Sequence, residues 1–215
     1  MLHRLIRISK RTPGSALLDV ACGTGSHLVF LGEHYEVEGL DIDEAMLDIA
    51  RSKLPQVPLH HGDMLELSLP RAFDVVVCLF SSIAYVRTAE RLKQAIARMA
   101  LHVLPGGVLI IEPWFSPEGF KGGIVHASFV DQPGLKIARM NVSEVADLVS
   151  ILQFHFLVAT TLGVEYLHER HELGLFDHSE YVVAFQDAGL SVVHDERGLE
   201  GRGLYIGTKQ LPPKA

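Results

Sequence analysis

The sequence has little of several features, and each shortage narrows the kind of protein it can be. Cys22 and Cys78 are its two cysteines among 215 residues, which disfavours a disulfide-stapled secreted fold and predicts structural thiols in a reduced, cytoplasmic protein. No apolar run is long enough to cross a bilayer, and the N-terminus has no apolar signal-peptide region. The net charge is -7 without any long block of Lys and Arg, so a nucleic-acid partner is not expected. Twelve histidines are scattered without a metal-binding motif, and no metal is expected.

What is present is the composition of an ordinary globular protein. Hydrophobic residues make up 48% of the chain and charged residues 21%, with no low-complexity tract and no internal repeat. A length of 215 residues fits one large domain, or one core with an inserted subdomain.

The stretch from residue 17 to residue 28 predicts a buried strand, a glycine-rich turn and the start of a helix. Gly23 and Gly25 permit backbone conformations closed to other residues and let a ligand approach the main chain. A dinucleotide fingerprint has a third glycine three positions after the second, where this chain has Leu28. The loop therefore predicts a site for a carboxylate, phosphate or ribose, and leaves the cofactor class open.

Two further acids follow predicted strands at the same edge of the expected sheet. Glu36–Asp41 predicts a second strand, and an acid at its tip is where doubly wound folds bind ribose hydroxyls, although a turn residue is the alternative. Asp43 predicts a helix N-cap, and the next strand, Val57–His61, leads into Gly62 and Asp63. The helix after Asp43 is expected to bury one face, formed by Met46, Leu47, Ala50 and Leu54.

The rest of the chain predicts an α/β fold with one interruption. A central strand over residues 73–80, a loop over residues 81–86 and a helix over residues 87–102 lead to a turn at residues 104–107 and a strand over residues 108–112. Residues 113–177 break this rhythm and predict an inserted antiparallel sheet of three or four strands, with Leu152, Phe154 and Phe156 on one side. A capping box at residues 177–180 opens a helix through Ala188, and two final strands form a closing hairpin.

Several strings together resemble one enzyme class. The D-V-A-C-G-T-G string and the L-P-G-G turn before a strand resemble class I S-adenosylmethionine-dependent methyltransferases. The strings H-G-D-M, L-F-S-S-I-A-Y, E-P-W-F-S-P-E and G-R-G-L-Y-I-G are similar to the sugar N,N-dimethyltransferases of macrolide biosynthesis, of the desosamine and mycaminose type. Those enzymes methylate the amino group of a dTDP-linked amino deoxysugar.

The resemblance implies a Rossmann-like, doubly wound, seven-stranded sheet with an antiparallel last strand. Residues 1–112 and 178–215 would form the cofactor-binding core, and residues 113–177 a substrate cover and homodimer surface. The implied cofactor is S-adenosyl-L-methionine, with S-adenosyl-L-homocysteine as product. The implied cofactor-binding residues are Asp19, Ala21, Gly23, Gly25, Asp41, Ile42, Met46, Asp63, Met64, Leu79 and Phe80.

The resemblance also implies an acceptor site. Trp114 and Arg202 match residues beside the sugar nucleotide, where a permanently charged, bidentate Arg suits a diphosphate, although an ion pair fixing the last strand is the alternative. Tyr85 occupies a position that in some relatives is a histidine proposed to assist deprotonation. Transfer needs mainly placement of a neutral amine, and we hypothesise that Tyr85 orients it or relays its proton, with Glu112 and His126 as weaker candidates.

Alternatives remain open at this stage. A small-molecule O- or C-methyltransferase shares the same core. A cofactor-binding protein with little catalysis is a third possibility, because the family has a longer segment before its first motif, folding over the cofactor, than Met1–Ala16.

Overall fold

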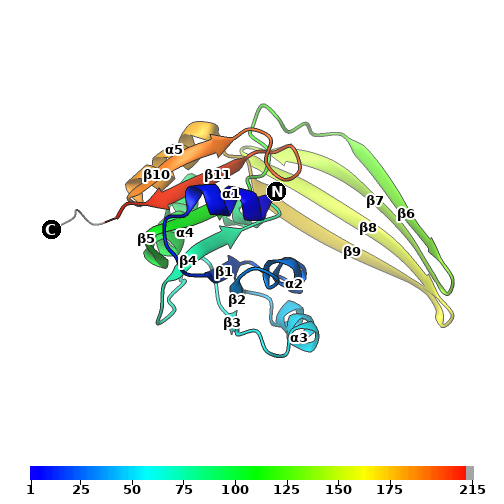
Figure 1. Cartoon of the computed structure of the whole chain (residues 1–215). Coiled ribbons are helices and arrows are strands. Elements are labelled where there is room, and N and C mark those ends of the chain that lie inside the picture. The colour runs from blue at the N-terminus through cyan, green and yellow to red at the C-terminus, as the bar shows by residue number, and fades with distance from the viewer. Residues whose placement is uncertain (212–215) are drawn as a thin grey trace.

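The structure is a computed structural model that describes residues 1–211. Its strands form two separate sheets (Figure 1). The first has seven strands in the order β10-β11-β5-β4-β1-β2-β3, and the second has four in the order β6-β7-β8-β9. The first sheet is parallel except for β11, which runs antiparallel to both β5 and β10. The predicted doubly wound fold with its antiparallel last strand is confirmed.

The elements of the first unit follow the predicted order along the chain. Its strands are β1 (Ala16–Val20), β2 (Glu36–Asp41), β3 (Leu59–His61), β4 (Phe73–Cys78), β5 (Val103–Ile111), β10 (Leu190–Asp195) and β11 (Leu204–Lys209). Its helices are α1 (Leu2–Ser9), α2 (Ser26–Leu31), α3 (Glu44–Lys53), the 3-10 helix η1 (Ser82–Val86), α4 (Ala89–Leu101) and α5 (His178–Asp187).

The central strand β4 is buried on both faces and divides the core into two layers. Val76 packs with the layer that contains Leu92 of α4 and Phe185 of α5. Its neighbour Val77 packs with the other layer, which contains Ile6 of α1 and Leu28 of α2. Alternate side chains of a strand point to opposite faces, so helices on both sides require the continuous apolar run that the sequence has here.

The four-stranded sheet consists of β6 (Val125–Gln132), β7 (Leu135–Ala146), β8 (Val149–Thr160) and β9 (Gly163–Gly174), all antiparallel. It curves away from the seven-stranded sheet (Figure 1). Residues directly opposite each other in such a sheet share a face, so the register defines two faces. The inner face carries Arg139, Asn141, Ser143, Leu152, Phe154, Glu169 and His171, and the outer face carries Val125, Phe129, Met140, Val142, Leu157 and Tyr166.

Several predicted boundaries are wrong by a few residues, and one turn is absent. The expected turn at residues 104–107 lies inside β5, which pairs Val103 with Phe73 and, after a register shift, Val108 with Val75. Gly107 permits this irregularity, because a Cβ there would lie 2.7 Å from the Asp74 carbonyl oxygen. The third strand starts at Leu59 rather than Val57.

Two further expectations are corrected. The expected loop over residues 81–86 contains a short 3-10 helix, η1, whose Ile83, Ala84 and Val86 are buried. Met46 was expected on the buried face of α3 but is 43% exposed, because Leu47 and Ala50 point toward the sheet instead. Among residues 1–211, no helix has the length and apolar character needed to cross a membrane.

The capping box at the start of α5 gives a stability prediction. The Asp177 side chain accepts from the backbone of Glu180, and the Glu180 carboxylate accepts from the Asp177 N–H at 2.7 Å. Asp177→Ala removes one acceptor for a free helix N–H and is expected to lower the free energy of unfolding by about 1 kcal/mol, measured by urea denaturation. The control Asp187→Ala, which removes an exposed ion pair with Lys93, should change it by less; equal losses would contradict a capping role.

Candidate active site

The glycine loop after β1 exposes its backbone toward the edge of the sheet where parallel strands end. Ala21, Gly23 and Gly25 all have positive φ, at 61°, 53° and 74°. A Cβ at Gly23 would meet no atom within 4 Å, whereas one at Gly25 would lie 3.1 Å from Leu54 Cδ1. Gly25 therefore allows α3 to pack closely, and Gly23 leaves an uncovered stretch of main chain that a ligand can approach.

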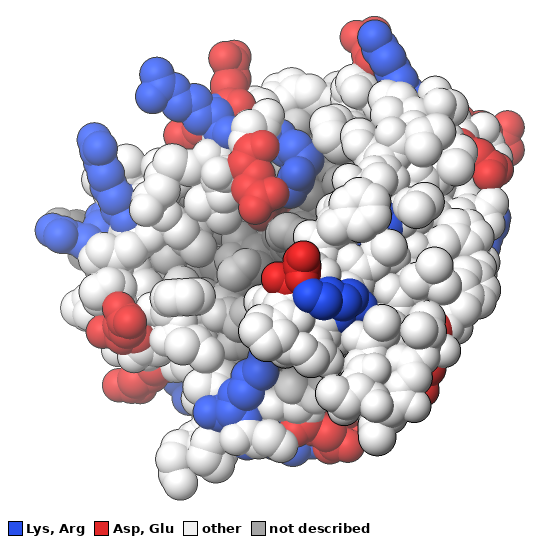
Figure 2. Space-filling view, turned by 90° about the vertical axis from the view of Figure 1, so that its right-hand side faces the viewer, with Lys and Arg blue, Asp and Glu red and all other residues white. Residues whose placement is uncertain are grey.

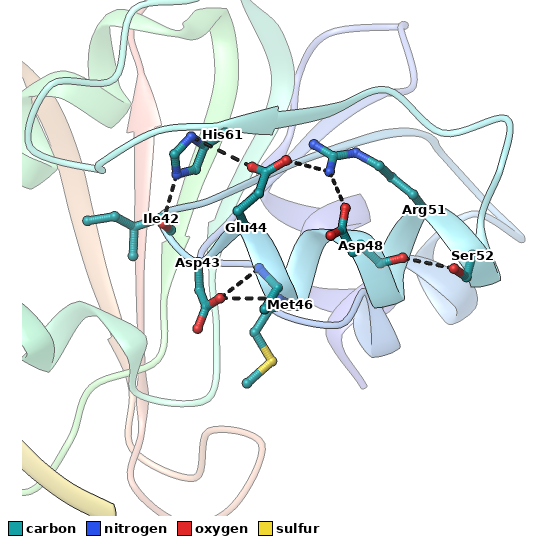
Figure 3. Close-up of polar contacts among 9 residues, drawn as sticks. Ile42, Asp43, Glu44, Met46, Asp48, Arg51, Ser52 and His61 are labelled. Atoms are coloured by element: carbon teal, nitrogen blue, oxygen red, sulfur yellow. Dashed lines mark hydrogen bonds and ion pairs between the residues drawn. The ribbon is translucent and has the colours of Figure 1, made fainter.

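Asp41, at the tip of β2, fixes this loop in place. Its Oδ2 accepts from the Gly23 N–H at 2.6 Å and its Oδ1 accepts from the Asp43 N–H at 2.9 Å. Asp43 in turn caps α3 by accepting from the N–H groups of Ala45 and Met46 (Figure 3). One buried carboxylate thus joins the ends of β1 and β2 to the start of α3.

Asp19 is a buried carboxylate without a partner. No described residue donates a hydrogen bond to either of its oxygens, and its side chain is 1% exposed. Burial, with a smaller contribution from Asp41, raises the pKa of Asp19 from 3.8 to about 8. A cationic group brought close to it would restore the charged form, so this position suits a ligand that carries an ammonium group.

A cavity of about 150 Å³ continues from Asp41 along the sheet edge. Its lining includes Ala21, Ile42, Asp63, Met64 and Tyr85. This volume is below the roughly 300–1,000 Å³ of a complete ligand pocket, so the cavity accommodates one part of a ligand. At its edge, His61 Nε2 donates to the Ile42 carbonyl oxygen at 2.9 Å and its Nδ1 lies 3.7 Å from Glu44 (Figure 3).

Tyr85 connects this cavity to the four-stranded sheet. Its hydroxyl lies 2.5 Å from His171 Nδ1, and His171 Nε2 lies 3.2 Å from Glu169 Oε2. Burial, with a further contribution from Glu169, raises the pKa of Tyr85. Strand alternation in the sequence places His171 and Glu169 on one face, but it carries no signal that this face meets Tyr85.

Glu112, just after β5, is buried and already engaged. Its Oε2 accepts from the Phe80 N–H at 2.8 Å, and its Oε1 lies 3.4 Å from Arg202 Nη2. Arg202 also pairs with Glu200 at 3.2 Å and lies 5.6 Å from the centre of the Trp114 ring. Arg202 therefore forms an ion pair, which was the alternative to a diphosphate-binding role. No described residue accepts a hydrogen bond from its buried Nε.

A second, larger cavity of about 560 Å³ lies against the inner face of the four-stranded sheet. Three aromatic rings pack against one another at its wall, with Trp114 and Phe115 centroids 4.7 Å apart and Phe120 close to both. Arg139 and His126 line the same cavity. The structure therefore separates His126 from Tyr85, which lines the first cavity, and groups it with Trp114. Figure 2, viewed from the side of this sheet, shows a hollow bordered by charged side chains of both signs.

Comparisons with known proteins agree with this architecture. A family model described as a methyltransferase domain matches residues 17–107. A dTDP-3-amino-3,4,6-trideoxy-alpha-D-glucopyranose N,N-dimethyltransferase from Streptomyces venezuelae is 44% identical over 203 residues, covering 93% of this chain and 86% of the relative. A dTDP-3-amino-3,6-dideoxy-alpha-D-glucopyranose N,N-dimethyltransferase from Streptomyces fradiae is 42% identical, covering 93% and 80%.

Solved structures are similar over nearly the whole chain. DesVI from Streptomyces venezuelae superposes with a TM-score of 0.92 at 41% identity, covering 97% of this chain and 89% of that one. SAM-bound CalS10, an amino pentose methyltransferase from Micromonospora echinaspora, has a TM-score of 0.89 at 38% identity with the same coverage.

The sheet topology and the acids at its strand ends are those of a class I methyltransferase, an enzyme that uses S-adenosyl-L-methionine. Within that class, the similarity over most of its length shows that this chain belongs to the family of the dTDP-amino sugar N,N-dimethyltransferases. The chain's own residues fit the cofactor: Asp19, which has no hydrogen-bond partner within residues 1–211, suits its ammonium group, and the uncovered main chain at Gly23 leaves room beside it.

Asp19 gives a pH-dependent prediction. Between pH 3.8 and about 8 the folded protein keeps a proton on Asp19 that the unfolded chain has released. Because the folded state binds more protons, the free energy of unfolding falls as pH rises through this window. Asp19→Asn removes that titration. In thermal scans without cofactor, the melting temperature of this variant minus that of the wild type should therefore increase by a few degrees from acidic to mildly alkaline pH.

The exposed Asp48→Asn serves as the matched control, and its difference from the wild type should stay nearly constant with pH. A constant difference for Asp19→Asn as well would show that Asp19 is ionised in the folded protein over the whole range.

Proposed function

We propose that this protein methylates the amino group of a nucleotide-linked amino sugar, twice in succession, as a dTDP-amino sugar N,N-dimethyltransferase. The observation that carries the proposal is the connection between the two cavities. Trp114 of the aromatic cavity lies against Arg202, Arg202 pairs with Glu112, and Glu112 accepts from the Phe80 N–H at the donor side. One chain of contacts therefore adjoins both a methyl-donor site and a cavity large enough for an acceptor.

We propose a division of roles among the residues of the donor site. Asp19, Ala21, Gly23 and Gly25 would hold the amino acid part of the cofactor, with the Asp19 carboxylate facing its ammonium group. Asp41, Ile42 and Met46 would hold the ribose, and Asp63 and Met64 the adenine, while the main chain at Leu79 and Phe80 closes the site. In this scheme residues 1–112 and 178–211 form the cofactor-binding core, and residues 113–177 form the acceptor cover. Residues 212–215, which the sequence also assigns to the core, lie outside the described residues.

The acceptor side supports a sugar diphosphate. The Arg202 Nε has no partner among the described residues, and Glu200, which shares the guanidinium, has a side chain 55% exposed. A phosphate oxygen can accept from Nε and replace this exposed carboxylate, since Arg binds phosphate in a planar, bidentate manner. Trp114, held by its Nε1–H bond to Ser150 Oγ at 2.9 Å, would then bound the aromatic cavity at a fixed angle.

The chemistry asks the protein mainly for placement. S-adenosyl-L-methionine supplies a methyl group that is already activated on a sulfonium sulfur. The residues around it must hold a neutral amine in line and exclude water. We propose that Tyr85 contacts the amine, that Glu112 positions Phe80 and Arg202 rather than reacting, and that His126 contacts the acceptor from the aromatic cavity.

The test uses purified protein, S-adenosyl-L-methionine and dTDP-3-amino-3,4,6-trideoxyglucose, with products followed by mass spectrometry. We expect a monomethyl product that is converted to a dimethyl product. The matched acceptor with a hydroxyl in place of the amine should remain unmodified. Methylation of that acceptor would contradict N-transfer and favour an O-methyltransferase; no transfer to either would contradict the proposed function.

The role of Asp41 is tested on cofactor affinity. Asp41→Asn loses the carboxylate that accepts from the Gly23 and Asp43 N–H groups and would face the ribose. We expect about tenfold weaker binding of S-adenosyl-L-methionine by calorimetry, the equivalent of about one charge-assisted hydrogen bond. Asp48→Asn, on the exposed side of α3, should bind as the wild type does, and unchanged affinity in Asp41→Asn would exclude the ribose role.

We also propose that the protein forms a homodimer in the cytoplasm. The outer face of the four-stranded sheet exposes apolar side chains in several strands, with Val125 and Phe129 each 70% exposed and Tyr166 59% exposed. Contiguous apolar surface of this kind is typical of an interface, and a self-complementary face gives a two-fold dimer. Both cysteines are buried free thiols, as in a reducing compartment.

Light scattering after gel filtration tests the dimer. The wild type should have the mass of two chains, and Phe129→Lys, which places a charge in the proposed interface, should shift the mass toward one chain. Thr161→Lys, in the turn after β8, is the control and should remain dimeric. A monomeric wild type, or a dimer unaffected by Phe129→Lys, would remove this face as the interface.

A further inference from the structure

Tyr85, His171 and Glu169 form a continuous row of hydrogen-bonded groups that spans the two sheets. Tyr85 belongs to η1, beside the seven-stranded sheet, and the other two residues lie two positions apart on the inner face of β9. The Tyr85 hydroxyl to His171 Nδ1 distance is 2.5 Å and the His171 Nε2 to Glu169 Oε2 distance is 3.2 Å. The Phe154 ring packs against the imidazole nearly at a right angle, with the two ring centres 5.3 Å apart.

The partners of His171 determine the direction of these bonds. An ionised Glu169 can only accept, so His171 Nε2 carries the hydrogen that it donates to the carboxylate. Nδ1 of the neutral ring is then an acceptor, and the Tyr85 hydroxyl donates to it. The lone pairs of the phenolic oxygen remain available toward the cavity that Tyr85 shares with Asp41 and Asp63.

Tyr85 alone is a poor base for an amine. Burial and the nearby Glu169 raise its pKa, so its phenolate form is disfavoured at neutral pH. It can accept a proton from a methylated amine only if its own proton leaves at the same time. His171 Nδ1 stands where that proton would go.

The other charged groups near this row are paired with one another or belong to the cofactor cavity. On the opposite side of β9, Glu172 pairs with Arg87 at 2.8 Å and with Arg170 at 2.9 Å. Asp41, Asp63 and Arg91 line the cavity with Tyr85, and Arg139, which lines the aromatic cavity, has its guanidinium carbon 5.4 Å from the centre of the Phe154 ring. Within residues 1–211, Glu169 is the one carboxylate in contact with the imidazole.

We propose that His171, oriented by Glu169, is a positioning residue that receives through Tyr85 the proton displaced in each methylation. The inference rests on the proposed function. The amine nitrogen forms a bond to the methyl carbon while the carbon–sulfur bond breaks and its electron pair passes to sulfur. The resulting ammonium gives one proton to the Tyr85 oxygen, and the Tyr85 proton passes to His171 Nδ1.

Two methyl transfers to one nitrogen require this relay to reset. The amine must be neutral for each attack, so a proton has to leave the site after the first transfer. His171 has a side chain 30% exposed and Glu169 one that is 56% exposed, so both reach solvent, where the imidazolium can lose its proton. The row thus leads from the cavity to the surface.

The test measures kcat against pH with dTDP-3-amino-3,4,6-trideoxyglucose as acceptor. His171→Asn keeps an acceptor for Tyr85 but cannot take a proton, and we expect a roughly tenfold to hundredfold loss in kcat with KM little changed. Glu169→Gln removes the carboxylate that accepts from His171 Nε2, so kcat should also fall across the pH range, by less than in His171→Asn, with KM little changed.

His168→Asn is the matched control, because His168 lies on the opposite face of the same strand. It should retain the wild-type kcat and profile. A wild-type kcat in His171→Asn or in Glu169→Gln would overturn the relay. A wild type that methylates no amine would instead contradict the proposed function.

A second measurement does not depend on turnover. NMR measures the nitrogen chemical shifts of the histidines in the cofactor-free protein, and the signals lost in His171→Asn assign His171. These shifts should show a hydrogen on Nε2 and a hydrogen bond accepted by Nδ1. Tyr85→Phe should move the Nδ1 shift alone. A hydrogen on Nδ1, or shifts unchanged by Tyr85→Phe, would overturn the proposal whether or not the acceptor is correct.

Discussion

The structure of the site depends on one buried carboxylate, Asp41, and the two backbone N–H groups that it binds. A loop with positive φ at Ala21, Gly23 and Gly25 would have many conformations in isolation, because its two glycines lose the most backbone entropy on folding. The Gly23 N–H bond to Asp41 selects one of them, and the Asp43 N–H bond places the helix cap at a fixed distance. The ends of two parallel strands and the start of α3 thus become one rigid unit before any ligand is present.

The same carboxylate acts on its neighbour. Asp41 adds to the burial that keeps Asp19 protonated, and Asp19 has no donor of its own among the described residues. In the folded protein alone, burying the Asp19 carboxyl group without a hydrogen-bond donor is unfavourable. A cation bound beside this carboxyl group would offset that cost. A site of this kind trades stability for affinity, which agrees with the position of Asp19 at the end of the central part of the sheet.

Much of the fold follows from local patterns in the sequence. The apolar run at residues 73–78 predicts a strand covered on both faces, and Asp177 with Glu180 predicts the start of α5, because each signal concerns residues that interact over a few positions. The acids at the strand ends were expected at a ligand site because ligands bind where parallel strands end. The same reasoning misplaced the start of β5, since the register shift after Phe73 arises from pairing between strands.

The acceptor side could not be predicted to the same degree, because its contacts join segments far apart in the chain. Tyr85 and His171 are 86 positions apart, and Glu112 and Arg202 are 90 apart. Alternation along β9 predicts which residues share a face with His171. Which residues of other elements contact that face depends on the curvature of the sheet. The first of these contacts starts from β9, so the four-stranded sheet brings His171 to Tyr85 at the edge of the smaller cavity. A class I core without that sheet would leave Tyr85 without this contact.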